Sequence, residues 1–296
     1  MKTEELRLPS YGGQALIEGV LMRGSKYLAA AYRKPDGEIV VETEMLGKIY
    51  QSEIRKIPFL RGLVILWDAL GLGTKYLTRS ANFQTENENE KIEGPALYFT
   101  LLFSLLVAVA LFFLSPALLG KLLEQWLGFS HLVQNLIEGI IRLLLVVLYI
   151  WGIGKMSDIS RVFSYHGAEH KTINAFENHD NLDPQTVKKY STQHPRCGTA
   201  FILYVVLISV IVFAFVGKTD WYLLIVSRLL LLPLISMLAY EYIRFTADRL
   251  GNPFVSLLAK PGLWLQKLTT REPDEKIIEI SIAAFNAMYA LEKENQ

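Results

Sequence analysis

The chain has 296 residues, of which 51% are hydrophobic and 20% are charged, and its formal net charge is +1. Soluble globular proteins usually carry about 25% charged residues, so the apolar excess favours a membrane protein and excludes disorder or a coiled coil as the main class. The balanced charge gives no general basic field, and we therefore expect no nucleic-acid partner. The single cysteine, Cys197, excludes an intrachain disulfide.

The first residues, 1–58, predict a small β-rich unit. Its strands are expected at 16–22, 27–32 and 38–44. Pro35-Asp36-Gly37, between the last two strands, is a turn signal. Residues 59–94 are expected to form an amphipathic helix over 59–77, which is followed by a polar linker.

Residues 95–240 predict a membrane domain. Four apolar runs are expected to form transmembrane helices, at 95–119, 132–153, 200–216 and 221–240, because a helix needs about 20 apolar residues to cross the hydrocarbon core. Arg142 and Arg228 interrupt the second and fourth runs. Since a charge at mid-membrane costs about 2.5–3.5 kcal/mol, we expect both arginines to face the helix bundle or to snorkel to the membrane surface.

The distribution of basic residues predicts the orientation. The loop 154–199 holds six of them, whereas the first and third loops hold one lysine each, Lys121 and Lys218. The positive-inside rule therefore places the central loop and both termini in the cytoplasm. Residues 241–296 then form a cytoplasmic tail, in which we expect a break at Pro261-Gly262 and an amphipathic helix opened by Pro273.

The predicted fold class is mainly α. We expect a polytopic membrane protein with about four transmembrane helices, a small N-terminal β unit, and a cytoplasmic helical loop and tail. A lipid bilayer is its expected environment, and protein partners within the membrane remain open.

The central loop carries the most specific pattern in the chain. Ser157 or Asp158 is expected to cap a helix that holds His166, Glu169 and His170. Two histidines four residues apart lie on one helical face and can share one metal ion. Glu169 is next to them, in the order H-x-x-E-H, which is the inverse of the H-E-x-x-H order of zincins, and is a candidate for activating a metal-bound water.

A second cluster, His194-Pro195-Arg196-Cys197, comes just before the third apolar run. If the second and third runs pack together, His194 or Cys197 becomes a third metal ligand, and Glu241 at the end of the fourth run is a further candidate. Imidazole and thiolate ligands favour a divalent transition metal, most of all Zn²⁺. Arg196 joins Glu169 as a candidate catalytic residue.

The preferred hypothesis is a membrane-embedded, metal-dependent hydrolase whose substrate stays open. The alternative is a non-catalytic membrane scaffold or assembly factor, in which the cluster is a structural metal site or a set of hydrogen bonds. A transporter with Arg142 and Arg228 along its path is a third and weaker hypothesis, because the chain lacks repeated broken helices.

Four segments carry a resemblance to a known family. They are 12–24 (GGQALIEGVLMRG), 165–172 (YHGAEHKT), 194–199 (HPRCGT) and 268–274 (LTTREPD). With these motifs, spread over nearly the whole chain, the sequence resembles the YqhQ family of bacterial membrane proteins. The resemblance implies an integral protein of the bacterial cytoplasmic membrane, described as a predicted metal-dependent enzyme, and it adds Gln14, Glu18 and Arg23 as candidate site residues.

Overall fold

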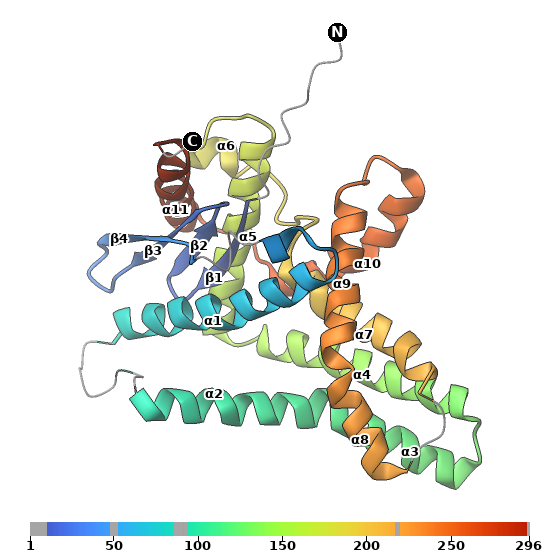
Figure 1. Ribbon diagram of the computed structural model, residues 1–296. Helices are drawn as coiled ribbons and strands as arrows, with labels where there is room; N and C mark the ends of the chain where they lie inside the picture. The colour runs from blue at the N-terminus through green and yellow to red at the C-terminus, as the bar shows by residue number, and fades with distance from the viewer. Residues whose placement is uncertain (1–10, 48–52, 86–90, 92–93, 217–219, 295–296) are drawn as a thin grey trace.

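The computed structural model describes residues 11–47, 53–85, 91, 94–216 and 220–294. The protein is mainly helical, with one four-stranded antiparallel sheet near its N-terminus. Figure 1 shows two regions: the sheet with its covering helices, and a set of apolar helices, of which α2 and α3 form a single line along the bottom.

The sheet has the strand order β1-β2-β3-β4. Its strands are β1 (Gly12–Leu16), β2 (Gly19–Arg23), β3 (Tyr27–Arg33) and β4 (Ile39–Met45). The expected strands at 27–32 and 38–44 are confirmed, and Gly37 in the turn between them has a φ of 91°. The single strand expected at 16–22 is wrong, because Ile17 and Glu18 form a tight turn in which Glu18 has a φ of 51°.

Both faces of the inner strands β2 and β3 are buried, whereas β4 is exposed or half-buried, and alternate residues along each strand point to opposite faces. On one face, Val20 and Met22 of β2 pack against the helices α5 (Ser157–Glu177) and α11 (Glu275–Glu294). On the other face, Leu21 packs against α1 (Leu60–Phe83), which extends six residues beyond the predicted helix at 59–77. The N-terminal strands and the central loop therefore share one core.

The expected C-terminal helix α11 is present, but it begins at Glu275 and Pro273 lies before it. Asp274 caps the helix by accepting a hydrogen bond from the N–H of Ile277 at 2.8 Å. The last turn of α11 binds the turn between β2 and β3. The buried Glu292 carboxylate accepts from the N–H groups of Lys26 and Tyr27, at 2.6 and 2.9 Å, and from the Ser25 hydroxyl at 2.6 Å. One carboxylate thus accepts hydrogen bonds from three consecutive residues at the turn between β2 and β3.

We expect Glu292→Ala to lower the free energy of unfolding by about 2–3 kcal/mol, because it leaves the buried N–H of Tyr27 and the partly buried N–H of Lys26 without a charged acceptor. Denaturant unfolding of the detergent-purified protein would measure it. Glu294→Ala, an exposed change in the same helical turn, should stay within about 0.5 kcal/mol of the parent protein. Equal effects of the two variants would contradict this role of Glu292.

The described residues contain two helices that are long and apolar enough to cross a bilayer: Gly94–Leu127 and α4 (His131–Ile153). A third span is possible if α8 (Trp221–Leu230) and α9 (Leu232–Ala247), bent by 42°, act as one. The prediction of four spans is therefore too high. The finding of two or three apolar helices suggests membrane association, while the orientation of the termini stays a prediction.

Two local features explain why the structure has fewer spans than the four that the sequence predicts. Helix α7 (Gly198–Ala214) has only 17 residues, so it is about 25 Å long against a hydrocarbon core of about 30 Å. Pro233 in the first turn of α9 cannot donate to the carbonyl four residues before it, which accounts for the bend after α8.

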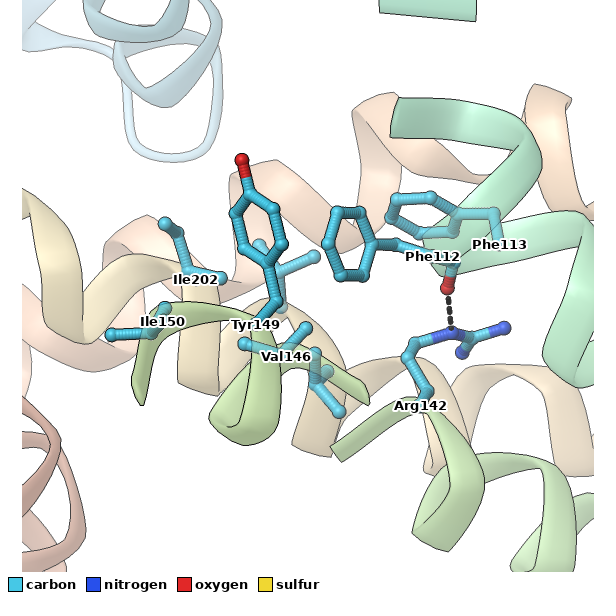
Figure 2. Close-up of a pocket in the computed structure, with 9 residues that line it drawn as sticks. Phe112, Phe113, Arg142, Val146, Tyr149, Ile150 and Ile202 are labelled. Atoms are coloured by element: carbon cyan, nitrogen blue, oxygen red, sulfur yellow. Dashed lines mark hydrogen bonds between the residues drawn. The ribbon is translucent and has the colours of Figure 1, made fainter. Parts of the chain in front are cut away.

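The longest helix joins α2 (Gly94–Val109), a π-helical turn (Ala110–Leu114) and α3 (Ser115–Leu127). None of the residues of α2 is buried, and its large side chains such as Tyr98 and Phe103 are exposed, as expected beside lipid. Pro116 has no N–H for the carbonyl of Phe112, and Nε of Arg142 donates to that carbonyl at 2.9 Å (Figure 2).

Arg142 belongs to a buried network that links α4, α7 and α8. Glu138 accepts from Nη2 of Arg142 at 2.6 Å, and from Nε and Nη2 of Arg228 at 2.9 and 2.7 Å. Arg142 also donates to Ser209 at 2.6 Å, and Phe213 packs against both guanidinium groups. The two arginines therefore face the helix bundle, as expected, and pair with one glutamate.

An apolar cavity of about 200 Å³ adjoins this network, between the π-helical turn, α4 and α7. Figure 2 shows Phe112, Phe113 and Tyr149 around it, with Arg142 at its edge. Because all three nitrogens of Arg142 already donate hydrogen bonds, the cavity presents hydrocarbon surface to its contents.

The expected break at Pro261-Gly262 is wrong, because α10 (Pro253–Thr269) continues through both residues. Gly262 allows close packing: a Cβ there would lie 2.8 Å from the hydroxyl of Tyr204 on α7. That hydroxyl donates to the carbonyls of Leu258 and Ala259, at 3.1 and 3.3 Å. Packing on α7 thus outweighs the poor helix propensity of proline and glycine.

Candidate metal centre

Three side chains that can bind a metal meet where α5 approaches the start of α7. His166 and His170 lie one turn apart on α5, and Cys197 is the residue that caps α7. One ligand atom from each lies within 4.8 Å of the others. Nε2 of His166 is 3.2 Å from Sγ of Cys197, and the two imidazole centroids are 4.4 Å apart.

Hydrogen bonds fix the orientation of both imidazoles. Nδ1 of His166 lies 2.9 Å from the carbonyl oxygen of Thr269, and Nδ1 of His170 lies 2.6 Å from that of Thr192. A carbonyl oxygen can only accept, so both Nδ1 atoms donate and Nε2 is left as the ligand atom. Histidines that bind metals usually have such an outer partner on their second nitrogen.

The backbone that supplies the Thr192 carbonyl is held by side chains of α5. Asn174 donates to the carbonyls of Ser191 and Gln193, at 2.9 and 3.0 Å. Nζ of Lys171 donates to the carbonyls of Lys188 and Tyr190, at 2.8 and 2.6 Å. These hydrogen bonds from the polar face of α5 therefore hold the connection to α7 along the helix.

The cap expected at Ser157 or Asp158 is not formed, because α5 starts after Met156 without a side-chain cap.

Gln266 of α10 fixes the next residue of this connection. Its side-chain amide accepts from the N–H of His194 and donates to the carbonyl of His194, both at 2.9 Å. Gly167 faces the carbonyl of Arg271 so closely that a Cβ there would collide with it. The start of α7, the end of α10 and helix α5 are thus held together around His166, His170 and Cys197.

The charges of the cluster influence one another strongly. Burial disfavours the thiolate, yet the neighbouring His166 and His170 hold the pKa of Cys197 well below its usual value. Burial also opposes the imidazolium form, but Cys197 and Glu169 raise the pKa of His166 to about 9 and that of His170 above its usual value. The cluster thus favours the thiolate, which is the form of cysteine that binds metals.

Glu169 lies beside the three ligand atoms. Its Oε2 is 3.4 Å from Nε2 of His170, and its side chain is almost fully buried. It packs against Gly13 of β1, where a Cβ would lie 2.7 Å from Cγ of Glu169. A cavity of about 80 Å³ opens here; among its lining residues are His166, Glu169, His170, His194, Arg196 and Cys197.

The structure places His194 and Arg196 next to this group. Nε2 of His194 is 3.4 Å from Oε2 of Glu177, and Arg196 forms an ion pair with the same carboxylate. The imidazole centroids of His170 and His194 are 5.8 Å apart. His194 thus borders the cavity with its Nε2 directed to Glu177, and Cys197 is the third residue of the group.

Comparisons with known proteins agree with the sequence motifs. A family model described as "Protein of unknown function (DUF1385)" matches residues 57–291. The chain is also 33% identical over 300 residues to "Uncharacterized protein YqhQ" of Bacillus subtilis (strain 168), a match that covers 96% of this chain and 93% of the relative. The chain belongs to the DUF1385 family, to which the YqhQ resemblance pointed. No solved structure matches it.

The DUF1385 match includes His166, His170 and Cys197 but begins after the first strands and their connecting turn, where three further candidate residues lie. Gln14 and Arg23 line a second cavity beside the first. Glu18 lies away from the three ligand residues and pairs with Arg161 and the hydroxyl of Tyr165 on α5. It therefore fastens the turn between β1 and β2 to α5.

Glu241 does not reach the group either. Its carboxylate forms an ion pair with Arg61 and accepts from the N–H of Phe59 at 3.0 Å. The same contact region includes Gly62, where a Cβ would lie 3.1 Å from Cβ of Tyr240. Glu241 thus holds the start of α1 against α9.

Sequence reasoning missed the groups that orient the ligands. Thr192 and Thr269 act through backbone carbonyls, which no residue pattern reveals. Gly13 belongs to the motif 12–24, but nothing in that motif indicates its role, which is to admit the side chain of Glu169. The one available signal was the motif 268–274, because its second residue supports His166.

Proposed function

We propose that the chain is a multi-pass protein of the bacterial cytoplasmic membrane with a zinc-dependent hydrolase centre on its cytoplasmic side. The observation that carries the proposal is the convergence of Nε2 of His166, Nε2 of His170 and Sγ of Cys197, with both Nδ1 atoms donating to carbonyls. In this arrangement the three atoms can act as ligands to a single metal ion.

The donor set fits zinc. Two imidazole nitrogens and one thiolate sulfur are ligands that Zn²⁺ accepts in tetrahedral sites, whereas Mg²⁺ and Ca²⁺ prefer oxygen. Three protein ligands leave a fourth position for water or substrate, as in catalytic zinc sites. The cavity of about 80 Å³ beside the ligand atoms is large enough for at least one water molecule.

Zinc in such a site supplies an activated water, because it lowers the pKa of bound water to about 7. The buried Glu169 is placed to accept a proton at this point and to return it to a leaving group. Arg196 lines the same cavity, where a guanidinium stabilises negative charge that develops during hydrolysis.

Deep burial of the cluster supports a second candidate, a membrane scaffold with a structural metal site. Only 1% of His170 and 7% of Cys197 are exposed, and structural zinc sites are closed and usually have four protein ligands. In that case a fourth residue, such as His194, completes the site and Glu169 has no role in proton transfer.

Metal analysis of the purified protein tests the shared part of both candidates. We expect about one zinc per chain in the parent protein and in His179→Asn, which changes an exposed histidine in a turn. The double variant His166→Ala/His170→Ala should lose the metal. Loading should be done near pH 9 or above, because the pKa of His166 is raised to about 9 and protons compete with the metal below that pH.

The result also separates the two candidates. His194→Ala should retain zinc in the three-ligand hydrolase site and lose it in a four-ligand structural site. Equal metal contents in the parent protein and the double variant would contradict metal binding at this cluster. The close Cys197–His166 pair would then be a thiolate–imidazole pair without a metal.

A further inference from the structure

A second cavity of about 230 Å³ lies against the proposed metal centre, between the sheet, α1 and the start of α7. We call it the arginine cavity; it is lined by Gly12, Gly13, Gln14, Leu21, Arg23, Leu28, Leu72, Gly73, Arg196 and Gly198. Four of these residues, Gly12, Gly13, Arg196 and Gly198, also line the cavity at the metal centre. The summed volume of the two cavities is just above about 300 Å³, which is the lower end of the range for small-molecule binding sites.

The lining has two chemically different sides. Its charged residues are the arginines Arg23 and Arg196, with no acidic residue among them. The opposite wall is formed by Leu21, Leu28 and Leu72. A guanidinium group matches the geometry of a carboxylate or phosphate, so the lining suits a molecule with an anionic end and a short apolar part.

Arg196 connects the two cavities. It forms an ion pair with Glu177 through one terminal nitrogen, while its Nε is buried and has no hydrogen-bond partner among the described residues. A buried donor without a partner costs about 1–3 kcal/mol, and an oxyanion in the arginine cavity would remove that cost.

Three glycines, Gly12, Gly13 and Gly198, are among the residues that both cavities share. A Cβ added to Gly12 or to Gly198 would meet no atom within 4 Å, so both positions face open space. On the far side, the amide of Gln14 lies so close to Gly73 of α1 that a Cβ there would collide with it. Gln14 therefore closes the arginine cavity against α1, whereas Gly12 and Gly198, which also line the cavity at the metal centre, leave room.

We propose that the arginine cavity binds the oxyanion end of a small amphiphilic substrate, a phosphate ester or a carboxylate, and directs its reacting bond to the metal centre. The oxyanion lies between Arg23 and Arg196, and the apolar part lies along the three leucines. The proposal rests on the proposed hydrolase function for the reaction, but binding of the oxyanion by the arginines requires no metal.

Isothermal titration calorimetry of the detergent-purified full-length protein with butyl phosphate, butyrate and butanol tests the proposal. We expect butyl phosphate or butyrate to bind and butanol not to bind, and the two anions distinguish phosphate from carboxylate. Arg23→Gln should weaken binding by about 10- to 100-fold, the loss typical of one hydrogen bond to a charged group. Arg79→Gln, which removes an exposed arginine of α1 paired with Glu42, should bind as the parent protein does.

Filling the cavity gives an independent measurement. Gly12→Ala and Gly12→Val add volume where no atom is in the way, so we expect normal thermal stability with progressively weaker anion binding. Zinc content should be unchanged in these variants and in Arg23→Gln. Failure of both anions to bind the parent protein, or binding that is insensitive to Arg23→Gln and to Gly12→Val, would overturn the proposal.

Treatment with a chelator separates this proposal from the proposed function. Anion binding that depends on Arg23 and Gly12 but survives metal removal supports the arginine cavity, whatever the metal analysis finds. If anion binding is lost when the metal is removed, and is unchanged in Arg23→Gln and Gly12→Val, then the metal alone binds the anion. That result overturns the arginine cavity and leaves the hydrolase centre standing.

Discussion

Glu138→Ala is expected to destabilise the protein by about 3–5 kcal/mol, because it leaves two fully buried arginines without their shared carboxylate. A single glutamate holds both Arg142 and Arg228, so its loss affects α4 and α8 together, and through Arg142 also the π-helical turn. Denaturant unfolding of the detergent-purified protein would measure the change.

Two further variants make this result specific. Glu38→Ala removes an exposed carboxylate that pairs with Lys34, and its effect should stay below about 1 kcal/mol. Replacing Glu138, Arg142 and Arg228 together by leucine should recover much of the loss, because no buried charge is left without a partner. A loss of less than 1 kcal/mol for Glu138→Ala would mean that the buried ion pairs do not hold the helices together.

The second large effect is expected at Glu169. Glu169→Gln keeps the size of the side chain but cannot accept a proton, and general acid–base catalysis is typically worth about 10²- to 10⁴-fold in rate. We expect this variant to retain zinc and the fold while losing cellular function. His170→Ala should lose zinc and function together.

Complementation of a deletion strain measures function here, with expression level and thermal stability as controls. Full complementation by Glu169→Gln, together with failure of His170→Ala, would identify a structural metal and favour the scaffold. Loss of zinc in Glu169→Gln would make Glu169 a ligand and remove its proposed role in proton transfer.

The sequence predicted those parts of the site that depend on spacing along one helix. His166 and His170 share a face of α5 because they are four residues apart, and that geometry follows from the helix alone. The choice between His194 and Cys197 could not be made in this way. It depends on Gln266, whose amide fixes the backbone of His194, and on the turn at Pro195-Arg196, after which Sγ of Cys197 lies 3.2 Å from Nε2 of His166.

The predicted fold was wrong where tertiary contacts or single turns override local preference. Pro261 and Gly262 signal a break by propensity, yet the contact between Gly262 and Tyr204 keeps α10 continuous. Conversely, the apolar run at 200–216 has the composition of a span, but its helix ends after Ala214. Hydropathy measures composition, and it does not show where a helix ends.

The hydrogen bond between His166 and the carbonyl of Thr269 has a consequence for biosynthesis. The two residues are 103 positions apart in the chain, and α7, α8, α9 and α10 are synthesised between them. At about 5–20 residues per second, the ribosome needs about 5–20 s to make that segment. Until then His166 lacks the partner that turns its Nε2 towards Cys197, so a nascent chain can orient this imidazole only after all the apolar helices have been made.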